Sequence, residues 1–421
     1  MTHTLAAWRR LDREHRVLLL LLGATSFFEG YDRSIVALAL KQIRGTFHLS
    51  QGTASLWLTF LYVGALPALV IARRADRIGR RRMLLFCVSA YTIATAATAF
   101  APSMGIFVFC QFAARLFLNA ETALVWTIAA EELPAASRGL GFGVLAMNAA
   151  LGTGFCAILF GGILDPAGVS WRVLYLVALP PLVLVGLLRR RLPETRRFIA
   201  TREEGGLAER WHEIFRPQWR RVLVLVLGTA FLLELTTQPA LFALDFLQTS
   251  RGLSASAASF MLVGAGVPGI PLMVAAGSLS DRYGRRFIGC GFGLLSLIGA
   301  AGFFWGPTNV PLLLGCLTLT IAGQLGSWPV LAGYAMELFP TALRGQASAW
   351  SSVAKVSGDA TSLALGGLLL GVTGGLPLTA TILAIGPLAG IFIIATRFPD
   401  THGRELEETS AVRSSAAPTP Y

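Results

Sequence analysis

The stretch Ala72-Arg-Arg-Ala-Asp76-Arg77-Ile-Gly79-Arg80-Arg81 returns 205 positions later as Gly277-Ser-Leu-Ser-Asp281-Arg282-Tyr-Gly284-Arg285-Arg286, and each copy lies between two long apolar runs. Glycine permits a sharp turn between two helices because it has no Cβ. Aspartate is favoured beside a helix N-terminus, and clustered arginines keep a loop on the cytoplasmic side of a membrane. The duplication therefore predicts two related halves, each with a tight cytoplasmic loop between two hydrophobic helices.

The composition places the chain in a lipid bilayer. Of its 421 residues, 54% are hydrophobic and 14% are charged, which is too apolar for a soluble protein. The formal net charge is +12, and the arginines gather in short segments beside apolar runs. That distribution indicates attraction to an anionic inner leaflet and disfavours nucleic acid as a partner.

The residues that cofactor or metal chemistry needs are missing at membrane depth. Only two lysines occur, Lys41 and Lys355, and neither follows a glycine. A phosphate-binding loop is therefore not expected, and neither is transport driven by ATP bound to this chain. All five histidines fall in termini or connecting loops, and the five cysteines lack the spacing of metal ligands. We expect no cofactor, no metal site and no enzymatic activity.

Twelve apolar stretches approach the length of about 20 residues that a transmembrane helix needs. They cover 17–40, 54–73, 83–101, 104–130, 139–164, 171–189, 220–246, 255–279, 287–306, 309–336, 345–371 and 376–397. The expected fold is an all-α membrane protein with twelve transmembrane helices in two pseudo-symmetric six-helix halves. A polar, Arg-rich segment after the sixth stretch predicts the domain boundaries. The expected parts are an N-terminal half at 1–188, a cytoplasmic linker at 189–219, a C-terminal half at 220–398 and a disordered cytoplasmic tail at 399–421.

The distribution of Lys and Arg among the loops predicts the orientation. The loops at 73–82, 189–221 and 281–286 are rich in arginine, whereas most alternate loops carry one basic residue or none. Since basic loops stay in the cytoplasm, both termini are expected there and the protein is expected in the plasma (inner) membrane. The first connection is an exception to this rule, because it holds Lys41 and Arg44.

A second duplicated pattern pairs Glu131-Glu-Leu-Pro134 and Arg138-Gly139 with Glu337-Leu-Phe-Pro340 and Arg344-Gly345, 206 positions later. Ion pairs among these charges and the Asp/Arg loops would hold one conformation closed and release it during a cycle. The alternative is that the charges only set the topology. The candidate gating residues are Asp76, Arg77, Gly79, Arg80, Glu131, Arg138, Asp281, Arg282, Gly284, Arg285, Glu337 and Arg344.

The duplicated loop resembles the signature loop of the major facilitator superfamily of transporters. Four other pieces resemble its branch of sugar porters, metabolite:proton symporters and aromatic-acid:proton symporters. They are Phe28-Glu29-Gly30-Tyr31-Asp32, Trp171-Arg172, Pro193-Glu194-Thr195-Arg196-Arg197-Phe198, and Pro399 to Glu408. The resemblance implies the twelve-helix fold, alternating access and a first-span acid that takes part in proton coupling.

Several positions depart from that branch and bear on the substrate. The glycine-rich run expected after Arg115 is replaced by Asn119-Ala-Glu121-Thr122, and the seventh span carries Glu234, Thr236, Thr237 and Gln238 where sugar porters place paired glutamines and tyrosines. These departures disfavour a sugar. The Gly-Pro motif of drug:proton antiporters is absent from the fifth span, which disfavours drug export.

Ionisable residues within the predicted spans point to the transport pathway, because a charge at the bilayer centre costs roughly 2.5 to 3.5 kcal/mol on insertion scales. Glu29 and Asp32 lie three residues apart on one helix face, and Arg33 follows Glu29 by four residues. Two neighbouring acids repel each other, which favours a proton on one of them. We expect Asp32 to carry the proton, with Glu29 and Arg115 as partners. The alternative is a permanent ion pair of Asp32 with Arg33 or Arg115.

The candidate substrate pocket mixes charged, amide and aromatic side chains. Lys355 and Asp359 lie about 16 and 22 Å along the eleventh span from its cytoplasmic end. They either neutralise each other or leave Lys355 to meet an anionic substrate, for which Arg115 is a second cationic ligand. The expected substrate-binding residues are Arg115, Glu121, Glu234, Gln238, Gln324, Trp328, Lys355 and Asp359.

Taken together, these features predict a secondary active transporter that works by alternating access. Proton-coupled uptake of a small organic solute, preferably an anion, is the favoured function. Its expected partners are that solute, protons and the bilayer, and the protein is expected to be a monomer. The alternatives are proton-coupled efflux of an amphipathic compound or drug, sugar transport, or a sensor that binds solute without moving it.

Overall fold

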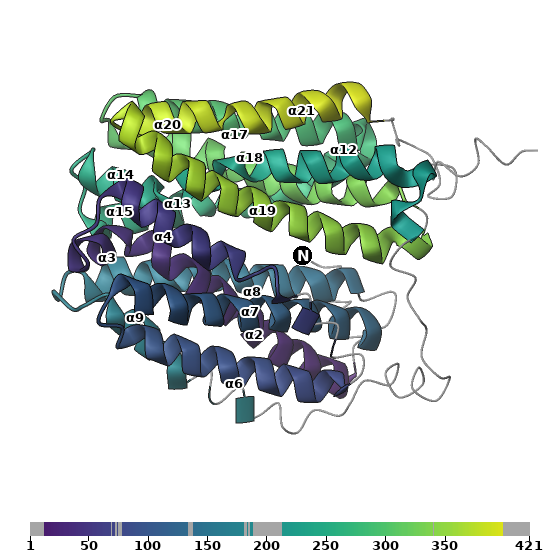
Figure 1. Ribbon diagram of the computed structural model, residues 1–421, viewed down its shortest axis with the longest axis horizontal. Coiled ribbons are helices and arrows are strands. Elements are labelled where there is room, and N and C mark those ends of the chain that lie inside the picture. Colours follow the sequence, from purple (N-terminus) through teal and green to yellow (C-terminus); the bar gives the residue numbers. More distant parts are fainter. Residues whose placement is uncertain are drawn as a thin grey trace, which may run out of the picture. The chain divides into compact units, whose positions relative to one another are not determined.

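The computed structural model describes residues 12–68, 70–71, 74, 78–133, 138–180, 183, 186–187, 213–339 and 341–398 (Figure 1). These residues form helices and connecting turns, with no strand among them. Each of the twelve predicted spans coincides with at least one described helix, which confirms the all-α prediction. Eight of the described helical stretches are long and apolar enough to cross a membrane. Of the predicted linker at 189–219, residues 189–212 lie outside the described residues, as does the whole predicted tail at 399–421. Residues 213–219 are described, and they form η3 (Glu213–Phe215) and the first turn of α12 (Pro217–Leu233).

Contacts between residues divide the chain into two compact units. Unit 1 comprises residues 1–208 and 241–260, and unit 2 comprises residues 209–240 and 261–421. The principal described helices of unit 1 are α2 (Arg13–Leu38), α3 (Leu40–Thr46), α4 (Gln51–Val63), α6 (Arg80–Ala99), α7 (Met104–Glu132), α8 (Arg138–Leu159), α9 (Arg172–Val177) and α14 (Ala243–Thr249). The π-helical turn η2 (Phe160–Leu164) extends α8.

Unit 2 begins its described part with a 3-10 turn, η3 (Glu213–Phe215), whose Ile214 is fully buried in a core cluster. The remaining helices are α12 (Pro217–Leu233), η4 (Glu234–Thr236), α13 (Thr237–Leu241), α16 (Gly269–Tyr283), α17 (Arg285–Trp305), α18 (Val310–Glu337), α19 (Thr341–Thr373), α20 (Leu376–Leu383) and α21 (Ile385–Arg397). The division between the units falls within two helices. The last residue of α13, Leu241, belongs to unit 1, and α15 (Ala255–Gly266) changes from unit 1 to unit 2 after Phe260. In Figure 1, α17 and α18 run side by side, in agreement with their extensive contacts.

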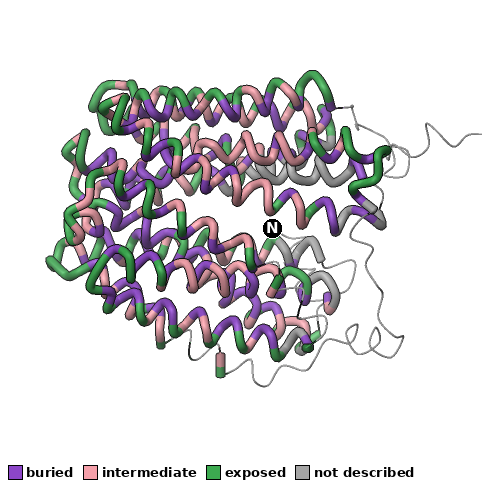
Figure 2. The backbone as a smooth tube through the Cα atoms, in the orientation of Figure 1, coloured by how far each residue is buried: buried purple, intermediate pink, exposed green. Residues whose placement is uncertain are grey.

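The surface of the helices is apolar, as expected for a protein surrounded by lipid. Figure 2 shows buried and exposed residues alternating along individual helices, so that one side faces protein and the other faces outward. Large apolar side chains occupy the outward side, including Phe109, Phe287 and Val372, which are 73%, 74% and 87% exposed. Such exposure would be unfavourable in water, and lipid chains remove the penalty because they are themselves apolar.

Helices α2 and α8 pack closely because glycines remove side chains from their interface. A methyl group added at Gly30 would overlap the carbonyl oxygen of Ala149, and one added at Gly152 would overlap that of Phe27. Between helices in a bilayer, close packing replaces the hydrophobic effect as the source of stability, so small residues favour association. The same α2 segment carries Asp32, and this packing therefore fixes the position of the candidate proton carrier.

We expect Gly152→Ala to destabilise the protein by about 1 to 3 kcal/mol or more, because the added methyl group must push α2 and α8 apart. Melting in detergent, followed by circular dichroism or intrinsic fluorescence, measures the effect. Gly154→Ala is a matched control on the same helix, since a methyl group there meets no atom within 4 Å. Equal melting temperatures for the two variants would contradict the close packing.

The two signature loops contain glycines in nearly the same unusual conformation. Gly79 precedes α6 with φ 109° and ψ 136°, and Gly284 joins α16 to α17 with φ 91° and ψ 138°. Residues with a Cβ rarely adopt such positive φ values, which explains the need for glycine at both turns. The predicted glycine turn in each half is therefore confirmed, whereas Asp76 and Arg77 lie outside the described residues.

The seventh span is broken and differs from the single helix predicted at 220–246. Helix α12 ends at Leu233, the 3-10 turn η4 follows, and α13 and α14 complete the span in two short pieces. The chain also leaves unit 2 within this span, because residues from 241 onward belong to unit 1. Breaks of this kind place polar backbone and side chains at membrane depth, where transporters bind solute.

Candidate functional site

Two polar clusters lie within the helices, one in each unit. The unit 1 cluster is centred on Asp32 of α2, whose side chain is completely buried. Neither of its carboxylate oxygens forms a hydrogen bond with any residue that the structure describes. A buried carboxylate without partners is costly as an anion, so a proton on Asp32 removes a charge that the surroundings do not satisfy.

Other titratable side chains surround Asp32 from neighbouring helices. Arg115 of α7 and Tyr91 of α6 lie close enough to interact electrostatically with the carboxylate. Tyr175 of α9 also interacts electrostatically with Asp32, and both tyrosines are at most 1% exposed. Arg115 was predicted from the sequence, whereas the two tyrosines were not, because an uncharged aromatic residue in an apolar run is not distinguishable from a residue of the core.

Glu29 has a partner of its own. Arg33 Nη2 lies 2.9 Å from Glu29 Oε1, in the predicted pairing one helical turn apart. The same Arg33 nitrogen donates a hydrogen bond to Asn119 Oδ1 of α7 at 3.1 Å. Asn119, which stands in the run that is glycine-rich in the related branch, thus links α7 to α2 through Arg33. In this conformation Arg33 therefore pairs with Glu29 and not with Asp32.

The unit 2 cluster is centred on Lys355 of α19. Its Nζ lies 3.7 Å from Glu234 Oε1, at the break of the seventh span. Asp359, one turn along α19, accepts a hydrogen bond from Thr237 Oγ1 at 2.5 Å and lies close enough to Lys355 to interact electrostatically. The side chains of Lys355 and Glu234 are 24% and 25% exposed, so a solute can reach them. Lys355 therefore interacts with two acids. The sequence offered either mutual neutralisation with Asp359 or contact with an anionic substrate, and it did not indicate Glu234 as a partner of Lys355.

Small residues along one side of α19 bring it against the broken span. Gly358 and Gly366 would each meet the seventh span if a methyl group were added, at Phe231 and Gln238 respectively. Between them, Ser362 Oγ donates to the carbonyl of Leu235 at 2.6 Å and accepts from the backbone N–H of Gln238 at 3.0 Å. Their spacing of four residues was a signal in the sequence that the analysis overlooked.

Gln238 is the least satisfied polar residue of this cluster. Its side chain is completely buried, and neither Oε1 nor Nε2 has a hydrogen-bond partner among the described residues. Buried amides are normally paired, so an unpaired one at a helix break is a candidate ligand for a polar group of the substrate. Among the other predicted ligands, Glu121 is 2% exposed and interacts with Tyr91, and Gln324 is exposed.

The structure describes the backbone but not the side-chain surroundings of several predicted residues. These are Arg80, Glu131, Arg138, Asp281, Trp328, Glu337 and Arg344. Arg282 is exposed and lies over the ring of Tyr283, while Arg285 begins α17. The ion pairs predicted among the gating charges thus remain a prediction. Within the described residues, no group of three or more His, Cys, Asp or Glu side chains is arranged to hold a metal ion.

The sequence and the fold match known transporters over most of the chain. The family model described as Major Facilitator Superfamily matches residues 22–242 and 229–420. The niacin transporter NiaP of Acinetobacter baylyi (strain ATCC 33305 / BD413 / ADP1) is 23% identical over 438 residues, covering 94% of this chain and 97% of that protein. The cis,cis-muconate transport protein of the same organism is 26% identical over 333 residues, covering 76% and 79%.

The solved structures agree on the fold. The inward open conformation of the xylose transporter XylE from E. coli superposes with a TM-score of 0.76 at 18% identity, covering 94% of this chain and 99% of that chain. A likeness at this identity shows the fold alone. The chain therefore belongs to the major facilitator superfamily, in its branch of sugar porters and metabolite transporters, and is an integral membrane transporter and not an enzyme.

Proposed function

We propose that this protein takes up a small organic anion together with protons by alternating access. The observation that carries the proposal is the buried Asp32 carboxylate, which lacks hydrogen-bond partners among the described residues and lies in the electrostatic field of Arg115. An acid in such surroundings gains from binding a proton, and a nearby guanidinium gains from binding an anion once that acid is neutral.

Arg115 links proton binding to substrate binding in this proposal. While Asp32 is charged, it attracts the Arg115 guanidinium and competes with a substrate carboxylate. A proton on Asp32 ends this competition, so the anion and the proton bind together and favour the same step of the cycle. Arg115 is 7% exposed, and its field is therefore weakly screened by water.

Lys355 and Gln238 are the proposed substrate ligands in unit 2. A substrate carboxylate competes with Glu234 for the Lys355 ammonium, while the unpaired Gln238 amide offers a donor and an acceptor to a second polar group. Glu121, Glu234, Gln324, Trp328 and Asp359 complete the proposed binding set. Two relatives support an anion by their names, because niacin and cis,cis-muconate are carboxylates.

We further propose that the protein works as a monomer in the plasma membrane with both termini in the cytoplasm, and that the sequence-derived halves at 1–188 and 220–398 are the moving parts. The duplicated Asp/Arg and Glu/Arg loops are the proposed cytoplasmic gate. The positive-φ glycines Gly79 and Gly284 support equivalent roles for the two loops, since each permits the same turn between helices.

Uptake by purified protein in liposomes tests this function. A panel of radiolabelled aromatic carboxylates, aliphatic dicarboxylates, pentoses and lipophilic cations is offered with and without an inward proton gradient. We expect a carboxylate to accumulate, and to do so only with the gradient. Accumulation of a pentose or cation instead would contradict the anion assignment. Binding of a panel member without movement would contradict transport and favour a sensor.

A further inference from the structure

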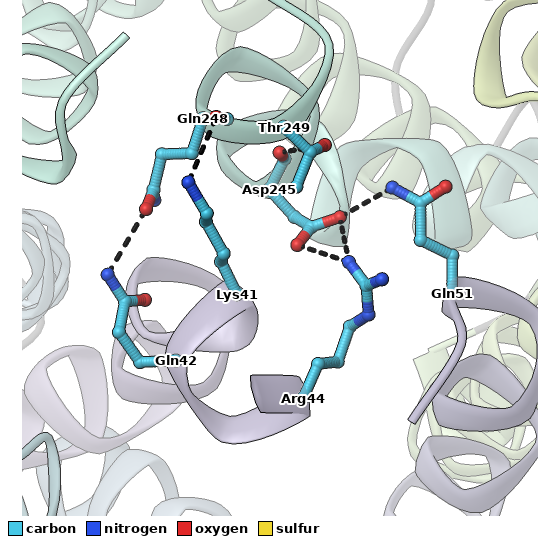
Figure 3. A network of polar contacts seen from close by, with 7 residues as sticks. All are labelled: Lys41, Gln42, Arg44, Gln51, Asp245, Gln248 and Thr249. Atoms are coloured by element: carbon cyan, nitrogen blue, oxygen red, sulfur yellow. Dashed lines mark hydrogen bonds and ion pairs between the residues drawn. The ribbon is translucent and has the colours of Figure 1, made fainter. Parts of the chain in front are cut away.

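A dense polar network joins the first connection of the chain to the end of the seventh span (Figure 3). Arg44 Nη1 of α3 donates to Asp245 Oδ1 and Oδ2 of α14 at 2.6 and 2.7 Å. Gln51 Nε2, at the start of α4, donates to Asp245 Oδ2 at 2.6 Å. One carboxylate therefore accepts hydrogen bonds from two separate helices of unit 1.

Gln248 adds a second point of attachment one turn further along α14. Lys41 Nζ donates to its backbone oxygen at 3.1 Å, and Gln42 Nε2 donates to its side-chain oxygen at 3.1 Å. Figure 3 shows Lys41, Gln42 and Arg44 pointing from α3 toward α14. Thr249 closes the end of α14 with a hydrogen bond to the Asp245 carbonyl at 2.6 Å.

The ion pair between Arg44 and Asp245 is largely buried, so it is strong when formed, and separating its partners only partly costs free energy. Asp245 is completely buried, Gln248 is 4% exposed, and the Arg44 side chain is 16% exposed. A buried ion pair separated without water leaves an uncompensated charge on each side. The network therefore favours two states, fully closed or opened to water, over partial separation.

The position of the network explains the exception in the charge distribution. Helix α4 begins at Gln51 and leads along the chain to the Gly79 turn, so within unit 1 the network lies at the opposite end of α4 from that turn. Lys41 and Arg44 break the positive-inside pattern at that end, and both are engaged by α14. The segment they hold follows directly after η4 and α13, which carry Glu234, Thr237 and Gln238.

We propose that six residues form a latch that closes the solute pathway at the end of unit 1 away from the Gly79 turn: Lys41, Gln42, Arg44 and Gln51 on one side, with Asp245 and Gln248 on the other. The latch must open whenever α14 moves off α3 and α4 to admit solute at that end. Arg44 and Asp245 provide its main strength, and the other four residues set its register. This device goes beyond the proposed function, because it acts whatever solute is carried.

A distance measurement without any solute tests the latch. Spin labels are attached at Gly45→Cys and Ser250→Cys, after replacement of the five native cysteines, and distances are measured by pulsed electron paramagnetic resonance in liposomes. Both positions are exposed, and a Cβ at Gly45 meets nothing within 4 Å. We expect one dominant short distance and a minor longer one.

An open state a few kcal/mol above the closed one is populated at about 0.1–10%. Arg44→Gln removes the ion pair that favours the closed state, so the longer-distance population should increase on the order of tenfold. The reversed pair Arg44→Asp with Asp245→Arg should restore the short distance. Lys41→Met should produce a smaller shift than Arg44→Gln, since it removes a cation from the same helix but only one hydrogen bond to a backbone oxygen.

An unchanged distribution in Arg44→Gln, or an equal shift in Lys41→Met, would overturn the latch. If Arg44→Gln does not fold, Gln51→Glu serves in its place, because it keeps the ion pair and adds a second acid beside Asp245. That variant should produce an intermediate shift toward the longer distance, and no shift would count against the proposal. None of these outcomes depends on which solute is carried or on proton coupling.

Discussion

Asp32→Asn is expected to abolish proton-driven accumulation of substrate while leaving exchange across the membrane measurable. Asparagine has the shape of a protonated aspartate but binds no proton, so the variant stays in the state that leaves Arg115 free for an anion. For an electroneutral symporter, one pH unit supports up to about tenfold accumulation per coupled proton, since one unit is worth 1.36 kcal/mol. The wild-type protein should approach this ratio, and the variant should only equilibrate its substrate.

Counterflow measured in the same liposomes separates lost coupling from lost folding, because it requires binding and movement but no gradient. Asp165→Asn is a suitable control, since Asp165 is also an acid of unit 1 and lies at the end of η2, where it accepts a hydrogen bond from Ser256 at 3.2 Å. Asp165→Asn should accumulate substrate as the wild-type protein does. Full accumulation by Asp32→Asn would assign the proton to another residue.

Lys355→Met is the second change with a large expected effect. It removes the proposed anion ligand and leaves Glu234 and Asp359 close together without a cation, and breaking a buried pair in this way costs about 3–5 kcal/mol. Partial exposure of both side chains lowers that cost here, because water screens the remaining charges. We expect substrate binding and transport to be lost together.

The double variant Lys355→Met with Glu234→Gln separates the two contributions. If Lys355 only neutralises Glu234, removing both charges should restore affinity. If Lys355 also binds the substrate carboxylate, as we propose, affinity should remain weaker by about 1.5–3 kcal/mol, the value of a hydrogen bond to a charged group. Calorimetric binding of the carboxylate identified by uptake measures this difference, and full rescue would remove Lys355 from the proposed substrate ligands.

The fold could be predicted from the sequence because its signals are long and repeated. Each span is an apolar run of roughly helical length, and glycine at the duplicated turn has a single physical explanation, which Gly79 and Gly284 both confirm. The break at Glu234–Thr236 could not be predicted in the same way. The sequence of an apolar run is the same whether its helix is continuous or interrupted. Here the interruption accompanies tertiary contacts with α19, such as the hydrogen bond from Ser362 to the carbonyl of Leu235.

The charged residues of the candidate site could be predicted from the sequence, whereas its uncharged residues could not. Asp32 and Lys355 stand out because a charged side chain within an apolar span is costly in free energy and usually has a functional role. Tyr91 and Ser362 carry no charge, and only the packing of α6 and α19 brings them to the site. Arg44 appeared in the sequence only as an exception to the loop rule, because its partner Asp245 lies 201 positions away.

Proton movement driven by substrate alone tests the central claim most directly. Liposomes containing the protein and an internal pH dye are prepared with equal pH on both sides, and the transported carboxylate is added outside. We predict acidification of the interior that exceeds that of protein-free liposomes and is absent with Asp32→Asn. Entry of the carboxylate through the wild-type protein without this additional acidification would contradict proton-coupled uptake.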